Sequence, residues 1–270
     1  MALAVSDEAE FEQDGDVTWI RIGDFAQSAV SIADPENLVF EYVQHLALCI
    51  DAFFARPGPV RVTHVGGAGL TLARWVHATR PGSPQIVLEP DVALTEAVRR
   101  ELPLPRGHRI RVRPQTGEAG FASLADASAD LVILDAYVDG RVPASLTTVE
   151  WLSEVARVLA PGGLFLANLG DRPGLRYAGR VASGARAALG PGSQTAYVGL
   201  QQVLKNKGFG NVVLMASRSP LPLFEMRRAT ARVPLPTGVV PPAEVLSRSA
   251  GAAPFSADGD DTSASPVPPT

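Results

Sequence analysis

From Val60 onward, short apolar runs alternate with amphipathic stretches along the chain. Five runs have the length and the β-branched content of buried strands, namely VRVTHV, QIVLEPD, RIRVRP, DLVILDA and GLFLANL. Helical periodicity marks several of the segments between them, such as LTLARWVHAT and VALTEAVRREL. Strands that alternate with helices predict a parallel sheet with helices on both faces. We therefore expect an α/β domain over residues 56–250, which closes with the strands TAYVGLQ and NVVLMASR.

Ahead of this domain, residues 16–55 have the pattern of a small β-hairpin followed by a lead-in helix. Val17–Ile22 and Ala29–Ile32 alternate like short strands on either side of a turn. Asp34 precedes a proline and an amphipathic period that continues to about Phe54. This order predicts a helix that begins with Asp34 as its cap.

Capping and composition predict where other ordered elements begin and end. The Thr-x-x-Glu pattern of Thr147–Glu150 is a capping box, which predicts the start of a helix that the Pro-Gly-Gly run after Ala160 ends. Residues 1–15 and 251–270 are rich in small, acidic and proline residues. Such segments bury too little apolar surface to offset the entropy of ordering, so we expect both ends to be flexible.

Composition and charge exclude several kinds of partner. The 270 residues include 24 Lys and Arg against 28 Asp and Glu, a net charge of −4, which gives no general attraction to nucleic acid. The single cysteine and four scattered histidines predict no disulfide and no metal site. No apolar run approaches the roughly 20 residues that span a bilayer, and the acidic start lacks the basic flank of a signal peptide. We expect a cytoplasmic protein that acts on small molecules, without a membrane partner.

Candidate chemistry lies where the predicted parallel strands end, since ligands of open α/β sheets bind at that edge. The first strand ends in the glycine cluster Gly66–Gly69, where missing side chains let a cofactor approach the backbone. About twenty residues later the second strand ends at Glu89, whose carboxylate can accept hydrogen bonds from both ribose hydroxyls of an adenosine. The fourth strand ends at Asp135. The cluster does not match the G-x-G-x-x-G of nicotinamide enzymes, which favours S-adenosylmethionine or a relative as the co-substrate.

The combined motifs resemble the spermidine/spermine synthase family, particularly its divergent actinobacterial-type members. The resemblance rests on VTHVGGAGLTLARW, VLEPD and ADLVILDAYVDGRVPASLTTVEWLSEVARVLAPGGLFLANL. FAQSAVSIADPENLVFEYVQHL is similar to the family's N-terminal hairpin and lead-in helix, and KGFGNVVLMASR to its closing strands. The resemblance covers about Trp19 to Ser217. It implies a methyltransferase-like Rossmann fold, with a mostly parallel seven-stranded sheet behind a small N-terminal β-hairpin.

The family's reaction implies a role for each matched residue. It is the transfer of an aminopropyl group from decarboxylated S-adenosylmethionine to a polyamine or other amine, without a metal. The acceptor nitrogen must lose a proton before it attacks, so the resemblance implies Asp135 as the base with Tyr42 or Tyr137 as helper. The implied substrate contacts are Gln27, Tyr42 and Asp139. The implied co-substrate contacts are Gly66, Gly67, Gly69, Glu89, Asp91, Thr116, Gly117 and Asp135. Family members commonly pair through the hairpin, which implies a homodimer.

The chain also departs from the family pattern. Gly69 stands where the family has an aspartate for the aminopropyl amine, and Thr116 stands where an aspartate recognises adenine, although Glu118 follows two residues on. The second acid of the catalytic loop is displaced to Asp139, and Gln44 replaces a pocket glutamate. Because a polyamine needs paired carboxylates, two alternatives stay open. One is methyl or other alkyl transfer from intact S-adenosylmethionine, and the other is a non-catalytic ligand-binding relative.

Overall fold

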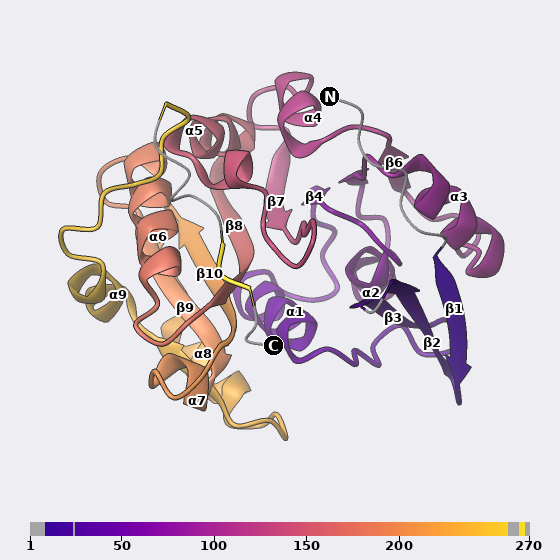
Figure 1. Ribbon diagram of the computed structural model, residues 1–270. Helices are drawn as coiled ribbons and strands as arrows, with labels where there is room; N and C mark the ends of the chain where they lie inside the picture. The colour runs from indigo at the N-terminus through magenta and orange to yellow at the C-terminus, as the bar shows by residue number, and fades with distance from the viewer. Residues whose placement is uncertain (1–8, 24, 259–264, 268–270) are drawn as a thin grey trace.

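A single mixed sheet forms the centre of the molecule (Figure 1). The computed structural model describes residues 9–23, 25–258 and 265–267. The eight strands run in the order β11-β9-β10-β8-β7-β4-β5-β6, with β4 to β8 parallel and β10 antiparallel to both of its neighbours. Their bounds are β4 (Val62–Val65), β5 (Gln85–Leu88), β6 (Ile110–Arg113), β7 (Ala129–Leu134), β8 (Leu159–Asp171), β9 (Gln194–Leu200), β10 (Gly210–Ser217) and β11 (Thr237–Val240). The predicted methyltransferase-like fold is confirmed, and β11 adds an eighth strand beside β9.

Helices cover both faces of this sheet, and the central strands supply both cores. Leu131 and Ile133 of β7 join a cluster with α1, α2 and α8, whereas Val132 and Leu134 join the cluster of α5 and α6. This alternation follows from the two-residue period of a strand. The helices are α1 (Glu41–Phe53), α2 (Thr71–Thr79), α3 (Val92–Glu101), α4 (Gly117–Ala122), α5 (Val149–Val158), α6 (Arg176–Leu189), α7 (Gln201–Leu204), α8 (Leu223–Thr230) and α9 (Pro242–Arg248). A 3₁₀ turn, η1 (Ala144–Thr147), precedes α5.

The N-terminal element is a three-stranded antiparallel sheet rather than a two-stranded hairpin. It consists of β1 (Glu10–Asp14), β2 (Val17–Ile22) and β3 (Phe25–Ser31), and lies beside α2 and α3 (Figure 1). Ile20 and Val30 pack there with Leu94 and Val98 of α3. The expectation that residues 1–15 are flexible is therefore wrong for β1, because each of its residues pairs with a residue of Val17–Arg21 in β2. Residues 1–8 lie outside the described residues.

Two predicted helix starts shift along the chain. Asp34 does not cap α1, because its carboxylate accepts from the Glu36 N–H at 3.1 Å and closes a local turn instead. The chain then stays extended until Phe40, and α1 begins at Glu41. Helix α5 is capped by Thr148, whose hydroxyl accepts from the Trp151 N–H, one residue later than the expected box.

The C-terminal part of the chain packs on the domain wherever the structure describes it. Phe255 is 2% exposed, its ring lies 5.4 Å from that of Tyr177, and its carbonyl accepts from the Val149 N–H at 2.8 Å. Ser265 is fully buried. Flexibility of the whole stretch 251–270 is therefore a wrong expectation for residues 251–258 and 265–267, because apolar and hydrogen-bonding side chains fix them. Residues 259–264 and 268–270 lie outside the described residues.

Candidate active site

The parallel register brings four residues into one row at the carboxyl edge of the sheet. Val65 of β4 pairs with both Leu88 of β5 and Leu134 of β7, and Leu134 pairs with Ala167 of β8. The next residue on each strand therefore occupies the same level. Across β5, β4, β7 and β8 the row is Glu89, Gly66, Asp135 and Asn168. The sequence predicted three of these four as site residues, namely Gly66, Glu89 and Asp135.

The glycine loop after β4 is held by Glu89. The Glu89 Oε2 accepts from the Gly67 N–H at 3.0 Å and from the Ala68 N–H at 3.3 Å, while Oε1 accepts from the Asp91 N–H at 3.0 Å. Gly66 has φ +89°, and a Cβ there would lie 2.2 Å from the Asp135 carbonyl oxygen. Only glycine allows this approach of β4 to β7. Loop and carboxylate thus form one preassembled unit.

Gly69 faces the N-terminal sheet. A Cβ at Gly69 would lie 2.7 Å from both Ile20 Cδ1 and Ser28 Oγ, and 2.8 Å from Val30 Cγ2. The side chains of β2 and β3 therefore fill the space into which a larger residue at this position would project. The absence of a carboxylate at position 69 is coupled to the packing of the N-terminal sheet.

Three of the predicted co-substrate residues have structural partners of their own. The Asp91 carboxylate caps α3 by accepting from the Leu94 N–H at 2.8 Å, and the Thr116 hydroxyl caps α4 by accepting from the Ala119 N–H at 3.4 Å. Gly117 is buried, and a Cβ there would lie 2.7 Å from side-chain atoms of Leu146 and Val65. These contacts account for the residue types without a ligand, so a co-substrate role for Asp91, Thr116 and Gly117 stays a prediction.

Asp135 is the titratable group of the row with the most perturbed environment. Asn168 donates its Nδ2 hydrogen to the Asp135 Oδ1 at 2.9 Å. Loss of hydration raises the pKa of Asp135 to about 6, and the hydrogen bond from Asn168 opposes that rise. A carboxyl group that titrates near neutral pH is suited to accept a proton and release it again.

Two tyrosines, Tyr42 and Tyr137, are close enough to Asp135 for its charge to affect them, but their hydroxyls have different surroundings. Burial and the charge of Asp135 raise the pKa of both Tyr42 and Tyr137. The Tyr137 hydroxyl donates to the Asn168 carbonyl at 3.1 Å and accepts from the Gly170 N–H at 3.0 Å, so β8 fixes it. Among the described residues no hydrogen bond to the Tyr42 hydroxyl is found. The ring of Tyr42 stacks on Phe40 at 5.7 Å, and Trp19 meets Phe40 edge-on at 5.7 Å.

The remaining predicted substrate residues differ in placement. Gln27 lies at a β-bulge, where Ile20 pairs with Ser28 and Arg21 with Ala26, so Gln27 is the extra, unpaired residue. Such bulges redirect side chains and recur beside active sites. Asp139 is exposed and has φ +51° in the tight turn that Val138 and Arg141 close. The amide of Gln44 donates to the Leu38 carbonyl at 2.7 Å, which gives the side chain a structural role.

Asn168 is the site residue that the sequence analysis missed. It is 1% exposed, and its Oδ1 has no hydrogen-bond partner among the described residues although it is buried beside Asp135. An isolated amide within the apolar run GLFLANL, at the end of a predicted buried strand, is the sequence feature that could have indicated it.

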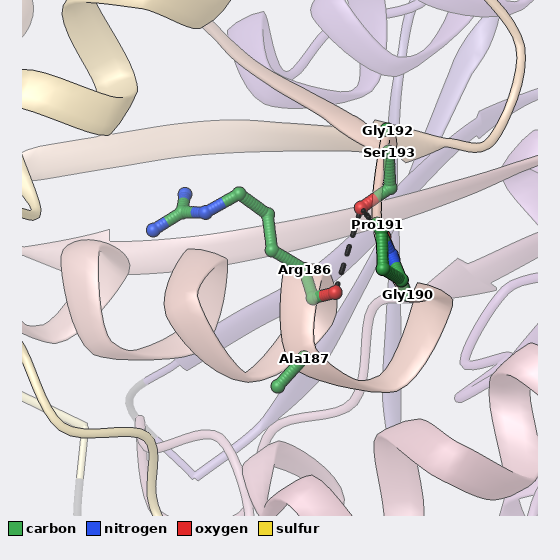
Figure 2. A pocket seen from close by; sticks show the side chains of 6 residues that line it. All are labelled: Arg186, Ala187, Gly190, Pro191, Gly192 and Ser193. Carbon is green, nitrogen blue, oxygen red and sulfur yellow. Dashed lines mark hydrogen bonds between the residues drawn. The ribbon is translucent and has the colours of Figure 1, made fainter.

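Other potential sites carry less chemistry. No group of three or more His, Cys, Asp and Glu suited to a metal occurs within the described ranges. Nor does any described helix have the length and apolarity to cross a membrane. A surface hollow of about 380 Å³ between α6 and β9 is lined by Arg186, Ala187 and the segment 190–193 (Figure 2). It lies where β9 begins, and because β9 runs parallel to β8 this is the sheet edge opposite Asp135.

Comparison with known proteins gives three informative relatives, whereas no family model matches the chain. A polyamine aminopropyltransferase of Chromobacterium violaceum is 20% identical over 168 residues, 62% of this chain and 63% of that protein, so this match spans less than two thirds of the relative. A crystallised probable spermidine synthase of Corynebacterium glutamicum is 28% identical with a TM-score of 0.83, covering 97% of this chain and 99% of the other. A spermidine synthase in complex with the transition state analogue AdoDATO is 19% identical with a TM-score of 0.54, over 81% and 76% of the two chains.

The strand order, the glycine turn with its carboxylate partner and the half-buried aspartate define an α/β fold of the methyltransferase-like class. Within that class, the likeness over nearly the whole chain agrees with the motifs that the sequence carries. The chain is thus similar over nearly its whole length to a probable spermidine synthase, and over more than half of it to a polyamine aminopropyltransferase.

Proposed function

We propose that the protein transfers the aminopropyl group of decarboxylated S-adenosylmethionine to an amine. The observation that carries the proposal is the row of Glu89, Gly66, Asp135 and Asn168, with Tyr42 and Tyr137 beside the half-buried aspartate. The analogue that fills a related spermidine synthase is an adenosyl compound, which supports an adenosyl co-substrate. In this proposal Glu89 holds the ribose and the Gly66–Gly69 loop lies under the sulfur-bearing chain.

The chemistry follows from proton and electron balance. Asp135 takes one proton from the ammonium form of the acceptor, which frees the nitrogen lone pair. The nitrogen attacks the aminopropyl carbon bonded to the sulfonium, a carbon–nitrogen bond forms, and the carbon–sulfur electron pair stays on sulfur. The products are the extended amine and neutral 5′-methylthioadenosine. No charge builds up on the leaving group, so alignment of nitrogen, carbon and sulfur supplies most of the acceleration.

The fixed hydroxyl of Tyr137 and the unbonded hydroxyl of Tyr42 have separate tasks in this scheme. Tyr137 orients the segment that carries Asp135, since its oxygen bridges the Asn168 carbonyl and the Gly170 N–H. Tyr42 contacts the acceptor nitrogen, while Gln27 and Asp139 contact the remainder of the acceptor. Asp91, Thr116 and Gly117 border the adenosine.

One observation favours a second candidate reaction. Because β2 and β3 fill the space in front of Gly69, no carboxylate at that position pairs with the donor's amine. Intact S-adenosylmethionine carries its own carboxylate next to that amine and therefore needs less negative protein charge there. Methyl or other alkyl transfer from S-adenosylmethionine is the alternative, and a non-catalytic ligand-binding relative is the remaining one.

The proposal extends to the setting of the enzyme. The partner is a small-molecule amine, with neither nucleic acid nor membrane involved, and two copies pair through the N-terminal sheet in the cytoplasm. These points rest on the acidic net charge and on the family resemblance.

Calorimetric titration of the purified protein with decarboxylated and with intact S-adenosylmethionine separates the candidates. The proposal expects binding of the decarboxylated form with at least about tenfold preference, which corresponds to about 1.4 kcal/mol. Preference for the intact form would establish the alternative transfer. Binding of neither compound would leave only the non-catalytic relative.

A further inference from the structure

The C-terminal residues Ser265–Val267 bind the loop that follows β7. The Ser265 Oγ accepts from the Val142 N–H at 2.7 Å, and the Ser265 carbonyl accepts from Arg141 Nη1 at 2.8 Å. Ser265 is fully buried, although more than a hundred residues separate it from this loop in the chain. A buried hydroxyl that satisfies a buried main-chain N–H is a specific contact.

This contact lies next to the candidate active site. The loop begins directly after Asp135, and Tyr137 within it is hydrogen-bonded to β8. A Cβ on Gly170, whose N–H donates to the Tyr137 hydroxyl, would lie 3.8 Å from the Pro266 carbonyl oxygen. A Cβ on Gly140 would lie 4.0 Å from Val267 Cγ1. The segment therefore lies next to both the loop that follows β7 and the C-terminal end of β8.

The loop has little local structure to hold it in place. Val138, Asp139 and Arg141 are exposed, and two hydrogen bonds between Val138 and Arg141 close the turn. Asp139 and Gly140 both have positive φ, which is a costly conformation for the aspartate. Segments with few buried contacts open at small free-energy cost, so an external contact decides their order. Tyr137 anchors the loop at its start, and Ser265 anchors it at Val142.

We propose that Ser265–Val267 is a C-terminal clasp that positions the acceptor side of the active site. It fixes the loop between Tyr137 and Val142, and thereby the placement of Asp135 and Tyr137 toward the acceptor; this functional part rests on the proposed transfer reaction. Ser265 is a positioning residue, because it acts through the loop. The glycine loop and Glu89 lie on the other side of β7, so the co-substrate half of the site is independent of the clasp.

Hydrogen exchange of the full-length protein tests the structural part. Ser265→Ala removes the hydroxyl that accepts from the Val142 N–H. Arg141→Ala removes the hydrogen bond to the Ser265 carbonyl. Because the Arg141 side chain is exposed, this second substitution leaves the core unchanged. Ser256→Ala is the matched control, since Ser256 also bonds the body of the protein, at Glu150, but on the exposed surface. We expect at least about tenfold faster exchange for residues 138–142 in S265A and a smaller increase in R141A. Exchange should stay unchanged in S256A and at residues 66–70 in every variant.

Kinetics of the same variants test the functional part. The clasp predicts that S265A raises the acceptor KM at least about fivefold, with the affinity for the adenosyl co-substrate unchanged, because only the acceptor side loosens. Wild-type exchange rates in both S265A and R141A would overturn the clasp. Faster exchange with an unchanged acceptor KM would overturn its positioning role. If the wild-type protein transfers nothing, the transfer proposal fails, while the exchange rates still decide whether the clasp exists.

Discussion

Asp135 combines two properties that suit the proposed base, namely a poorly hydrated position next to a hydrogen-bond donor and a pKa of about 6. Burial raises its pKa from 3.8 to about 6, and Asn168 keeps the carboxylate oriented through the 2.9 Å hydrogen bond. Half of the group is therefore ionised near pH 6, so a small change in surroundings moves a proton on or off.

Asp135→Asn should abolish transfer and leave co-substrate affinity nearly unchanged, because the amide keeps the shape but cannot accept the proton. In the wild-type enzyme, kcat/KM should rise with pH through about 6 and fall about tenfold per pH unit below it, since only the carboxylate acts as base. Steady-state kinetics across pH 5–8 measure this profile. Activity of the asparagine variant at the wild-type level would remove Asp135 from the mechanism.

The same pKa predicts a dependence of stability on pH. The folded pKa of about 6 lies above the reference value of 3.8, so folding favours the protonated group. The stabilisation is fully present below the unfolded pKa and is lost as pH rises through about 6. Asp135→Asn lacks this dependence. As pH rises from about 4 to about 6, the free energy of unfolding of the variant should therefore increase relative to that of the wild type. A difference in free energy of unfolding between the two proteins that is the same at every pH would contradict the raised pKa.

The two tyrosines should respond differently to loss of the hydroxyl. Tyr137→Phe breaks two hydrogen bonds to β8 and leaves the Gly170 N–H unpaired, so we expect a loss of about 1–3 kcal/mol in stability. Tyr42→Phe loses no hydrogen bond described in the structure, so stability should stay within about 0.5 kcal/mol while turnover falls about tenfold or more. Urea denaturation and kinetics on both variants separate the roles. If Tyr42→Phe lost stability and Tyr137→Phe lost only turnover, Tyr42 would be the tyrosine with the structural role.

At the scale of elements, the N-terminal sheet takes part in the site by packing on the glycine loop. The Ser28 and Thr71 hydroxyls lie 2.9 Å apart, and Thr71 donates to the Ala29 carbonyl at 3.1 Å, so β3 is fixed against the start of α2. Ile20 and Val30 are buried in the same contact. The residue at position 69 is therefore constrained by β2 and β3 as well as by any ligand.

Gly69→Asp, which restores the carboxylate of the family pattern, should destabilise the protein by about 2–4 kcal/mol. The added Cβ would meet three side-chain atoms at 2.7–2.8 Å, and the charge would enter a contact formed by Ile20, Val30 and a single hydroxyl, that of Ser28. Gly69→Ala serves as the steric control, with about half of that loss expected. Thermal or urea denaturation measures both. A fully stable aspartate variant that binds decarboxylated S-adenosylmethionine more tightly would mean that position 69 faces the ligand.

Much of the fold follows from local pattern, and what the sequence analysis missed depends on distant contacts. The short apolar runs predict β4 to β8 and their parallel direction, because several of them are separated by stretches with helical periodicity. The start of α1 was missed because an aspartate caps turns as well as helices, and the Asp34 carboxylate accepts from the Glu36 N–H in a local turn. Burial of Ser265 and of Phe255 in an acidic, proline-rich tail depends on partners over a hundred residues away. Likewise, Asn168 became a site residue only once the register was known.

In the whole molecule, the sheet aligns in one row the residues proposed to hold the co-substrate and to act as base, and three separate parts of the chain pack around it. The N-terminal sheet covers the glycine loop, the β7 loop carries the tyrosine anchor, and the C-terminal segment holds that loop. Under the proposed function, co-substrate binding belongs to β4 and β5, and acceptor binding belongs to the elements around β7 and β8. Substitutions on one side should therefore change one binding constant and leave the other nearly unchanged.

The most direct measurement is a transfer assay by mass spectrometry, in which the protein is incubated with decarboxylated S-adenosylmethionine and a panel of mono-, di- and triamines, with Asp135→Asn as the inactive control. Our account predicts an acceptor that gains one aminopropyl group, with an equal amount of 5′-methylthioadenosine released by the wild type alone. Transfer of a methyl group from S-adenosylmethionine, or equal product from the wild type and the asparagine variant, would contradict it.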